Sequence, residues 1–267
     1  SGRCGSQYLA KLIGTTLKTK SFHEPAPDMS GVYLHMINAF PYHRTFRQRS
    51  IKVQAISSFL RQNPSSHTYC ETNHMFIKTF FDVVLNAYHN VEVIILRREL
   101  PLVLKSFLDL GYFGPNEKSW KRWMSSPNAV TAAISCIDSV DHLDQVDLCI
   151  AYLIDIEARS LRFRRTYPHI KVHEVRIEAL NDYAEVFRFL TRLGLSPTRR
   201  TIKTIGSRTN LRLEAKKRYS SSAKVEYCRK RIHEYIGKAS ALGIELPSTL
   251  PLIPFEKKPE ANLDAPF

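Results

Sequence analysis

The chain has 267 residues, enough for one large α/β domain or two small ones, and 43% of them are hydrophobic. This composition disfavours a disordered chain, and no apolar run reaches the roughly 18 residues of a membrane helix. The formal net charge of +14 favours an anionic partner: a nucleotide phosphate, a nucleic acid, a sulfated glycan or an anionic membrane surface.

Five cysteines are scattered along the chain, without a CxxC pair and without metal-ligand spacing to the ten histidines. This pattern disfavours a disulfide scaffold or a zinc site and favours reduced thiols, and with them a cytoplasmic location. The printed sequence opens directly on a glycine-rich loop of a kind that normally follows a strand. We therefore expect an upstream segment, which could also carry a targeting sequence.

The first dozen residues combine a small turn, residues 2–5, with an apolar-periodic helix that carries Leu9, Leu12 and Ile13 on one face. Glycine at positions 2 and 5 lets successive backbone N–H groups point into one cavity, and the positive end of the helix adds to their field. The turn is therefore a candidate anion site. It is not a Walker A loop, because no Gly-Lys-Ser/Thr ends it.

Strand and helix patterns alternate after the first helix. We expect a short strand or loop over 18–27, mixed structure over 29–40, a basic helix over 44–60, a strand over 67–73, a helix over 76–88, a strand over 91–96 and a helix over 101–110. The run 91–96 is apolar enough for the centre of a parallel sheet. Two prolines end the stretch 18–27, so His23 and Glu24 are expected at a strand end that faces a cleft.

The second half continues the alternation up to a basic segment. We expect a loop over 111–127, a largely helical stretch over 129–165, a strand over 171–177, a helix that ends at 193–194, and a helix over 223–238. Residues 199–238 carry 13 Lys/Arg against 3 Asp/Glu, a balance of 13 − 3 = +10. The predicted architecture is a single α/β domain over 1–246, with a central parallel sheet flanked by helices, and a proline-rich tail over 247–267.

Three blocks, in order, resemble the sulfotransferases that use 3′-phosphoadenosine 5′-phosphosulfate. The first is the opening Gly-Arg-x-Gly-Ser loop, and the second places Arg98 at a strand end and Ser106 in the next helix. The third is the stretch 172–180, a strand that runs into Arg-x-Glu-x-Leu, followed by a helix and by Leu-Gly-Leu at 193–195. The resemblance covers about residues 1–215 and is closer to the branch with a Gly-Arg-Ser-Gly-type loop than to the phenol-type enzymes.

The resemblance implies a P-loop-like sulfotransferase fold and an enzyme that moves a sulfuryl group to a hydroxyl or amine acceptor, without a metal. It implies that the loop residues Arg3, Cys4, Gly5, Ser6, Gln7 and Tyr8 hold the 5′-phosphosulfate, that Arg98 and Ser106 hold the 3′-phosphate, and that Arg208 and Asn210 close over the adenosine. Arg3 stands where the family has a cation that follows charge on the bridging oxygen. Cys4 and Gln7 depart from the usual serine and threonine or serine, which puts the donor geometry in doubt.

The same resemblance suggests three candidates for the general base. Glu24, in His23-Glu24-Pro25, matches the Glu-Pro element whose glutamate takes the acceptor's proton, and His23 is its neighbour and the second candidate. His74 would be the base in an arrangement like that of the phenol-type enzymes. A simple packing or surface role is the alternative for each. The sequence does not identify the acceptor, although the basic charge mildly favours an anionic or carbohydrate one.

The competing interpretation is a non-catalytic basic α/β module that binds nucleic acid or another polyanion beside a degenerate nucleotide site. The +10 segment supports this interpretation, and the departures at Cys4 and Gln7 leave room for it. The enzyme interpretation is preferred, with adenosine 3′,5′-bisphosphate as its product, and a nucleotide kinase is disfavoured by the missing Gly-Lys-Ser/Thr. The sequence leaves the oligomeric state open.

Overall fold

The computed structural model describes residues 2–116, 118–207 and 223–252. Four strands form two parallel pairs: β1 (Thr19–His23) with β2 (Thr68–Thr72), and β3 (Glu92–Arg97) with β4 (Lys171–Arg176). The described strands therefore make two small sheets, where the sequence had predicted one continuous central sheet. The parallel pairing and the mixed α/β character are confirmed, and most of the described structure is helical.

Helices make up the rest of the regular structure. They are α1 (Ser6–Ile13), α2 (Val32–Ala39), α3 (Tyr42–Arg49), α4 (Ile51–Gln62), the π-helical η1 (Phe76–Phe80), α5 (Phe81–Ala87), α6 (Leu100–Asp109), α7 (Gln145–Thr166), α8 (Tyr183–Arg192), α9 (Arg199–Thr204) and α10 (Val225–Ala241), with short 3₁₀ turns η2 (Ser119–Arg122), η3 (Val140–His142) and η4 (Ile177–Asn181). None of the helices in the described ranges combines the length and the apolar character needed to cross a membrane.

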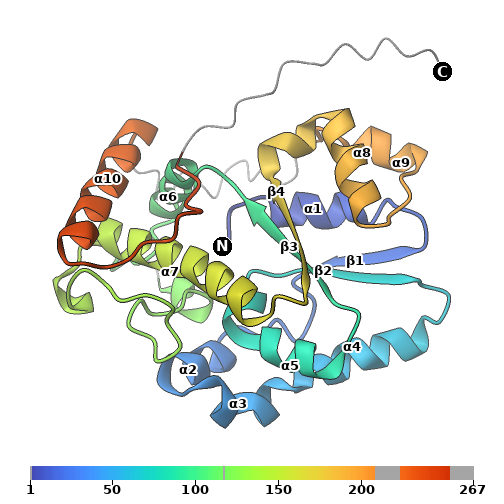
Figure 1. Cartoon of the computed structure of the whole chain (residues 1–267), viewed down its shortest axis with the longest axis horizontal. Coiled ribbons are helices and arrows are strands. Elements are labelled where there is room, and N and C mark those ends of the chain that lie inside the picture. Colours follow the sequence, from blue (N-terminus) through green and yellow to red (C-terminus); the bar gives the residue numbers. More distant parts are fainter. Residues whose placement is uncertain (1, 117, 208–222, 253–267) are drawn as a thin grey trace.

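Helices lie on both sides of the strands, α1 on one side and α4 and α5 on the other (Figure 1). The apolar face predicted for α1 is the buried one: Leu9, Leu12 and Ile13 share a hydrophobic cluster with Ile94 of β3 and Val175 of β4. Helix α1 also contacts β1 and β2. One helix therefore covers both small sheets, because its apolar stripe is wide enough to reach them.

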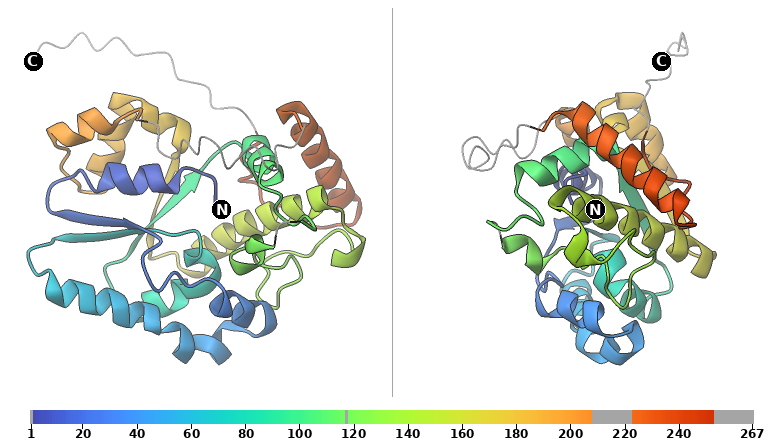
Figure 2. Two further views of the ribbon diagram at one scale, coloured as in Figure 1. Left: turned by 180° about the vertical axis from the view of Figure 1, so that it is seen from behind. Right: turned by 90° about the vertical axis from the view of Figure 1, so that its left-hand side faces the viewer.

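A second group of helices, α6, α7 and α10, lies to one side of the strands (Figure 2). Their buried faces form the cluster that contains Phe107, Tyr152 and Ile232. A third cluster lies between α2, α4, η1 and α5 and contains Ile37, Ile56 and Phe80.

Two helix predictions need correction. The stretch 44–60 is split at Ser50, whose N–H and hydroxyl both bond to the Phe46 carbonyl at the end of α3. The stretch 129–165 is helical only from Gln145, because the Asp144 side chain caps the helix there by accepting from the Asp147 N–H at 2.8 Å. Residues 129–144 form turns instead, and part of 29–40, expected to be mixed, forms α2.

Candidate functional site

Three of the predicted site residues lie within two positions of the carboxyl ends of parallel strands. Glu24 follows β1, His74 comes two residues after β2, and Arg98 follows β3. Carboxyl ends of parallel strands are where open α/β sheets bind their ligands. The glycine-rich loop lies at the same edge, since Arg98 Nη1 donates to the Arg3 carbonyl oxygen at 3.2 Å.

The backbone of the loop has the tight shape that its glycines suggested. Arg3 and Gly5 both have left-handed φ angles, 66° and 91°. A Cβ atom on Gly5 would lie 2.5 Å from Ile177 Cδ1, so any other residue here would have to displace the Ile177 side chain as well as adopt the left-handed backbone angle. The first backbone hydrogen bond of α1 runs from the Leu9 N–H to the Gly5 carbonyl. The N–H groups of residues 6–8 therefore have no acceptor within the helix.

The loop contacts both residues of the second predicted block. Arg3 Nε donates to Ser106 Oγ of α6 at 3.1 Å, while Arg98 bonds to the Arg3 carbonyl. Three groups that can bind phosphate thus come together from segments about one hundred positions apart in the sequence. Arg3 can contact Ser106 because α6 starts soon after the end of β3 and runs past the glycine-rich loop.

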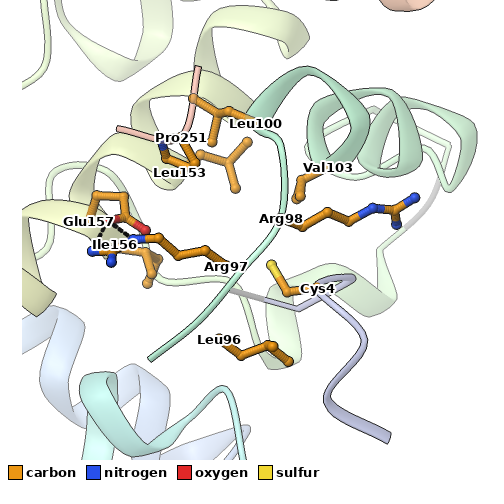
Figure 3. A pocket seen from close by; sticks show the side chains of 10 residues that line it. All are labelled: Cys4, Leu96, Arg97, Arg98, Leu100, Val103, Leu153, Ile156, Glu157 and Pro251. Carbon is orange, nitrogen blue, oxygen red and sulfur yellow. Dashed lines mark hydrogen bonds and ion pairs between the residues drawn. The ribbon is translucent and has the colours of Figure 1, made fainter. Parts of the chain in front are cut away.

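The two consecutive arginines at the end of β3 have different surroundings (Figure 3). Arg97 extends to Glu157, with Nη2 and Oε2 3.0 Å apart, and it also forms an ion pair with Glu174. Its positive charge is therefore balanced by two carboxylates of the protein. Arg98 extends the other way, past Cys4. The cavity between them encloses only about 20 Å³, room for about one water molecule and far too little for a nucleotide.

The other loop residues divide between buried and exposed. Cys4 is 5% exposed and belongs to the cluster of α6 and α7, and the hydroxyl of buried Tyr8 donates to the Leu180 carbonyl at 2.8 Å. Gln7 is exposed, and Gly5 and Ser6 are half-buried. Donor contacts from Cys4 and Tyr8 would therefore come from the backbone, and these roles stay predictions. The predicted adenosine contacts Arg208 and Asn210 lie outside the described residues.

The three candidate bases lie in one cluster. Glu24 Oε1 is 3.4 Å from His74 Nε2 and 4.0 Å from His23 Nε2. The Glu24 N–H donates to the Thr72 carbonyl, which continues the β1–β2 pairing past the end of β1. Glu24 itself has a left-handed φ of 49°, a conformation that few non-glycine residues adopt. Its side chain is 34% exposed, so an acceptor could reach the carboxylate.

A buried lysine completes the cluster, and the sequence analysis did not identify it. Lys78 Nζ, fully buried in η1, donates to His74 Nδ1 at 3.1 Å, to the Tyr152 hydroxyl at 3.1 Å and to the Trp123 carbonyl. When Lys78 is an ammonium group it can only donate, so His74 Nδ1 accepts from it and the imidazole proton is assigned to Nε2, which faces Glu24. The four-residue spacing of His74 and Lys78 was the signal available in the sequence.

The pKa values in this cluster are shifted mainly by burial. Burial raises the pKa of Glu24 above its ordinary value, although the charges of His23 and Lys78 act against this shift. Burial, followed by the charge of Lys78, holds the pKa of His74 well below 6.5, so this imidazole is neutral. Burial, followed by Arg159, also lowers the pKa of Lys78. Glu24 is thus the member of the cluster with the raised proton affinity of a general base.

A second buried lysine holds the segment that follows Glu24. Lys52 Nζ donates to the carbonyls of Pro25 and Pro27 at 2.9 and 3.0 Å and lies 2.7 Å from Glu71 Oε1. Both ends of this ion pair are nearly inaccessible to solvent. Lys52 therefore fixes the turn that presents Glu24, and its position within a basic helix gave no sign of this role.

Comparisons with protein-family models, with curated proteins and with solved structures found no match to this chain. Within the described ranges, no group of three or more His, Cys, Asp or Glu side chains is placed to hold a metal ion. None of the five cysteines, all of which lie in the described ranges, forms a disulfide, and Cys4, Cys149 and Cys228 are buried.

Proposed function

We propose that this chain transfers a sulfuryl group from 3′-phosphoadenosine 5′-phosphosulfate to a hydroxyl or amine acceptor. The observation that carries the proposal is the joint contact of Arg98 and Ser106 with Arg3 of the glycine-rich loop. A bisphosphorylated nucleotide needs two anion sites at one place. The loop N–H groups and the Arg98–Ser106 pair are two such sites side by side.

The donor would lie on the outer side of the loop. The small cavity behind Arg98 cannot contain it, and Arg97 is neutralised by Glu157 and Glu174. Arg3, Arg98 and Ser106 are partly accessible to solvent, so their donors can face a ligand on the surface of the loop and of α6. The helix dipole of α1 adds to the attraction for a negative group at this place.

Glu24 acts as the base in the proposed reaction. The acceptor oxygen or nitrogen attacks the sulfur, and its proton passes to the Glu24 carboxylate. The bond between sulfur and the bridging oxygen breaks, and its electron pair leaves with adenosine 3′,5′-bisphosphate. Neutral His74, held by Lys78, positions the carboxylate through its Nε2 proton. A raised pKa suits Glu24 for this step, because a more basic carboxylate takes the proton more readily.

Calorimetric titration with adenosine 3′,5′-bisphosphate tests the donor site. We expect saturable binding that Arg98→Ala and Ser106→Ala each weaken at least about tenfold, since each removes a phosphate hydrogen bond. Arg188→Ala is the control, because it removes an arginine that is 65% exposed on α8, outside the site. Equal affinities in all four proteins would contradict the proposal. Labelled donor and a panel of acceptors would then identify the acceptor class.

The polyanion-binding alternative is favoured by the basic charge, of which Arg199 and Arg200 are exposed examples. Helix α10 supports it less: Arg229 pairs with Glu99 at 2.7 Å, and Arg231 pairs with Asp144 and Asp147. Those cations are already neutralised. A polyanion binder predicts heparin or oligonucleotide affinity that falls steeply with salt and does not change in Arg98→Ala.

A further inference from the structure

A cavity of about 810 Å³ separates the two small sheets. Every residue of β2, Thr68–Thr72, lines one wall of this cavity, and five of the six residues of β3 line the opposite wall. We refer to it as the inter-sheet slot. Because both walls are strands, the slot is as long as a strand of five or six residues, about 17–20 Å.

The two faces of the slot are apolar and covered by helices. Leu9 and Ile13 of α1 line one face of the slot. Residues of α4, α5 and α7, such as Ile56, Val84 and Phe163, also line the slot. Figure 1 shows α1 on one side of the strands and α4 and α5 on the other. A position with strands at both edges and helices on both faces is the environment of an inner strand in a parallel sheet.

The walls of the slot also carry backbone N–H and C=O groups that can form hydrogen bonds with another strand. Among the described strands, β2 pairs only with β1, and β3 pairs only with β4. The second edge of each strand faces the slot, so its N–H and C=O groups can accept a further strand. A small apolar ligand could fill the volume, but it would leave both of these edges without partners.

We propose that the slot holds one extended, mainly apolar strand, parallel to β2 and β3 and joined to the amino side of the glycine-rich loop. Its direction follows from the slot's ends: Cys4 and Ser6 line it together with Asn73 and Leu96, at the carboxyl ends of β2 and β3. A parallel strand leaves the slot at that end and passes directly into the loop. Helix α1 then packs back over the strand, as helices do after parallel strands.

This strand would merge the two pairs into one five-stranded parallel sheet. It would also fix the loop from its amino side and hold Arg3 against Arg98 and Ser106. The inference does not rest on the proposed sulfuryl transfer, because any anion site at this loop would be held in the same way.

The test adds a strand to the 267-residue chain. One protein carries Val-Ile-Val-Ile-Val-Ile-Gly-Gly before Ser1, and its matched control carries proline at the third and fifth of these positions, which removes two ladder donors. Hydrogen exchange by mass spectrometry follows the amides of β2 and β3, and calorimetry gives the Tm. We expect exchange at these amides to slow at least about tenfold and the Tm to rise by about 5 °C or more, in the first protein only.

Three results would overturn the proposal. The first is equal exchange and equal Tm in the two extended proteins. The second is a dimer of the unextended chain, seen by light scattering, whose β2 and β3 amides are already protected, because a second copy would then fill the slot. The third is protection of these amides by dodecanoate, used as an apolar probe, that the fused strand does not prevent. That result would assign the slot to a small apolar ligand.

Discussion

Replacing Gly5 by alanine is expected to destabilise the protein through two separable effects. The backbone of Gly5 has φ 91°, and a left-handed angle costs a non-glycine residue about 1–2 kcal/mol. The new Cβ would also lie 2.5 and 2.7 Å from Ile177 Cδ1 and Cγ1, an overpacking that costs about 1–3 kcal/mol. Together the two effects predict that Gly5→Ala lowers the free energy of unfolding by about 2–5 kcal/mol.

Gly194→Ala is the matched control, because Gly194 also has a positive φ, 66°, but nothing lies within 4 Å of its Cβ position. Gly194→Ala should lower the free energy of unfolding only by the backbone strain, about 1–2 kcal/mol. Urea unfolding of both variants, and of Ile177→Ala alone and with Gly5→Ala, measures the difference. The coupling between positions 5 and 177 should be about 1–3 kcal/mol, since removing the isoleucine relieves the clash. A coupling near zero, with equal losses for the two glycine variants, would refute this account of the loop.

Three further variants test the cluster around Glu24. Glu24→Gln keeps the shape of the side chain but removes the proposed base, so turnover should fall about 10²–10⁴-fold while calorimetry shows unchanged binding of adenosine 3′,5′-bisphosphate; near-normal turnover would exclude Glu24 as the base. Lys52→Met leaves Glu71 buried without its cation and should lower the free energy of unfolding in urea by about 3–5 kcal/mol; a loss under about 1 kcal/mol would show that the pair does not hold the turn. His74 has a folded-state pKa well below 6.5, so below that pH the unfolded chain binds a proton that the folded chain does not, and stability is lost as the pH falls. Between pH 7.5 and 5.5, His74→Gln should therefore lose about 1 kcal/mol less stability than the unchanged protein, and equal losses would show that the sign is wrong.

Local patterns in the sequence determined most of the regular elements. The apolar face of α1, the apolar run that forms β3 and the amphipathic stretch that forms α10 all depend on neighbours within a few positions. Such short-range periodicity can be read before any fold is known. The same reading failed over residues 129–144, because the helix there begins only where Asp144 supplies a cap, and apolar content alone does not mark that point.

The composition of the site was decided partly by sequence and partly by tertiary structure. The sequence analysis paired Arg98 with Ser106 and named Glu24 as a candidate base, but only the chain fold shows that Arg3 contacts Ser106 and that His74 lies beside Glu24. It gave no indication that Lys78 and Lys52 are buried, because a lysine in a helix is usually solvated. Their roles come from distant carbonyl and carboxylate groups, which no local pattern encodes.

The division of the strands into two pairs was also decided by tertiary structure. Each strand could be predicted from its own residues, yet strand order depends on partners that lie tens of positions away. The strand predicted before the loop stays a prediction, and the inter-sheet slot is the structural reason to test it. Local propensity determined what the segments of this chain are, whereas long-range hydrogen bonding and burial decided which of them meet.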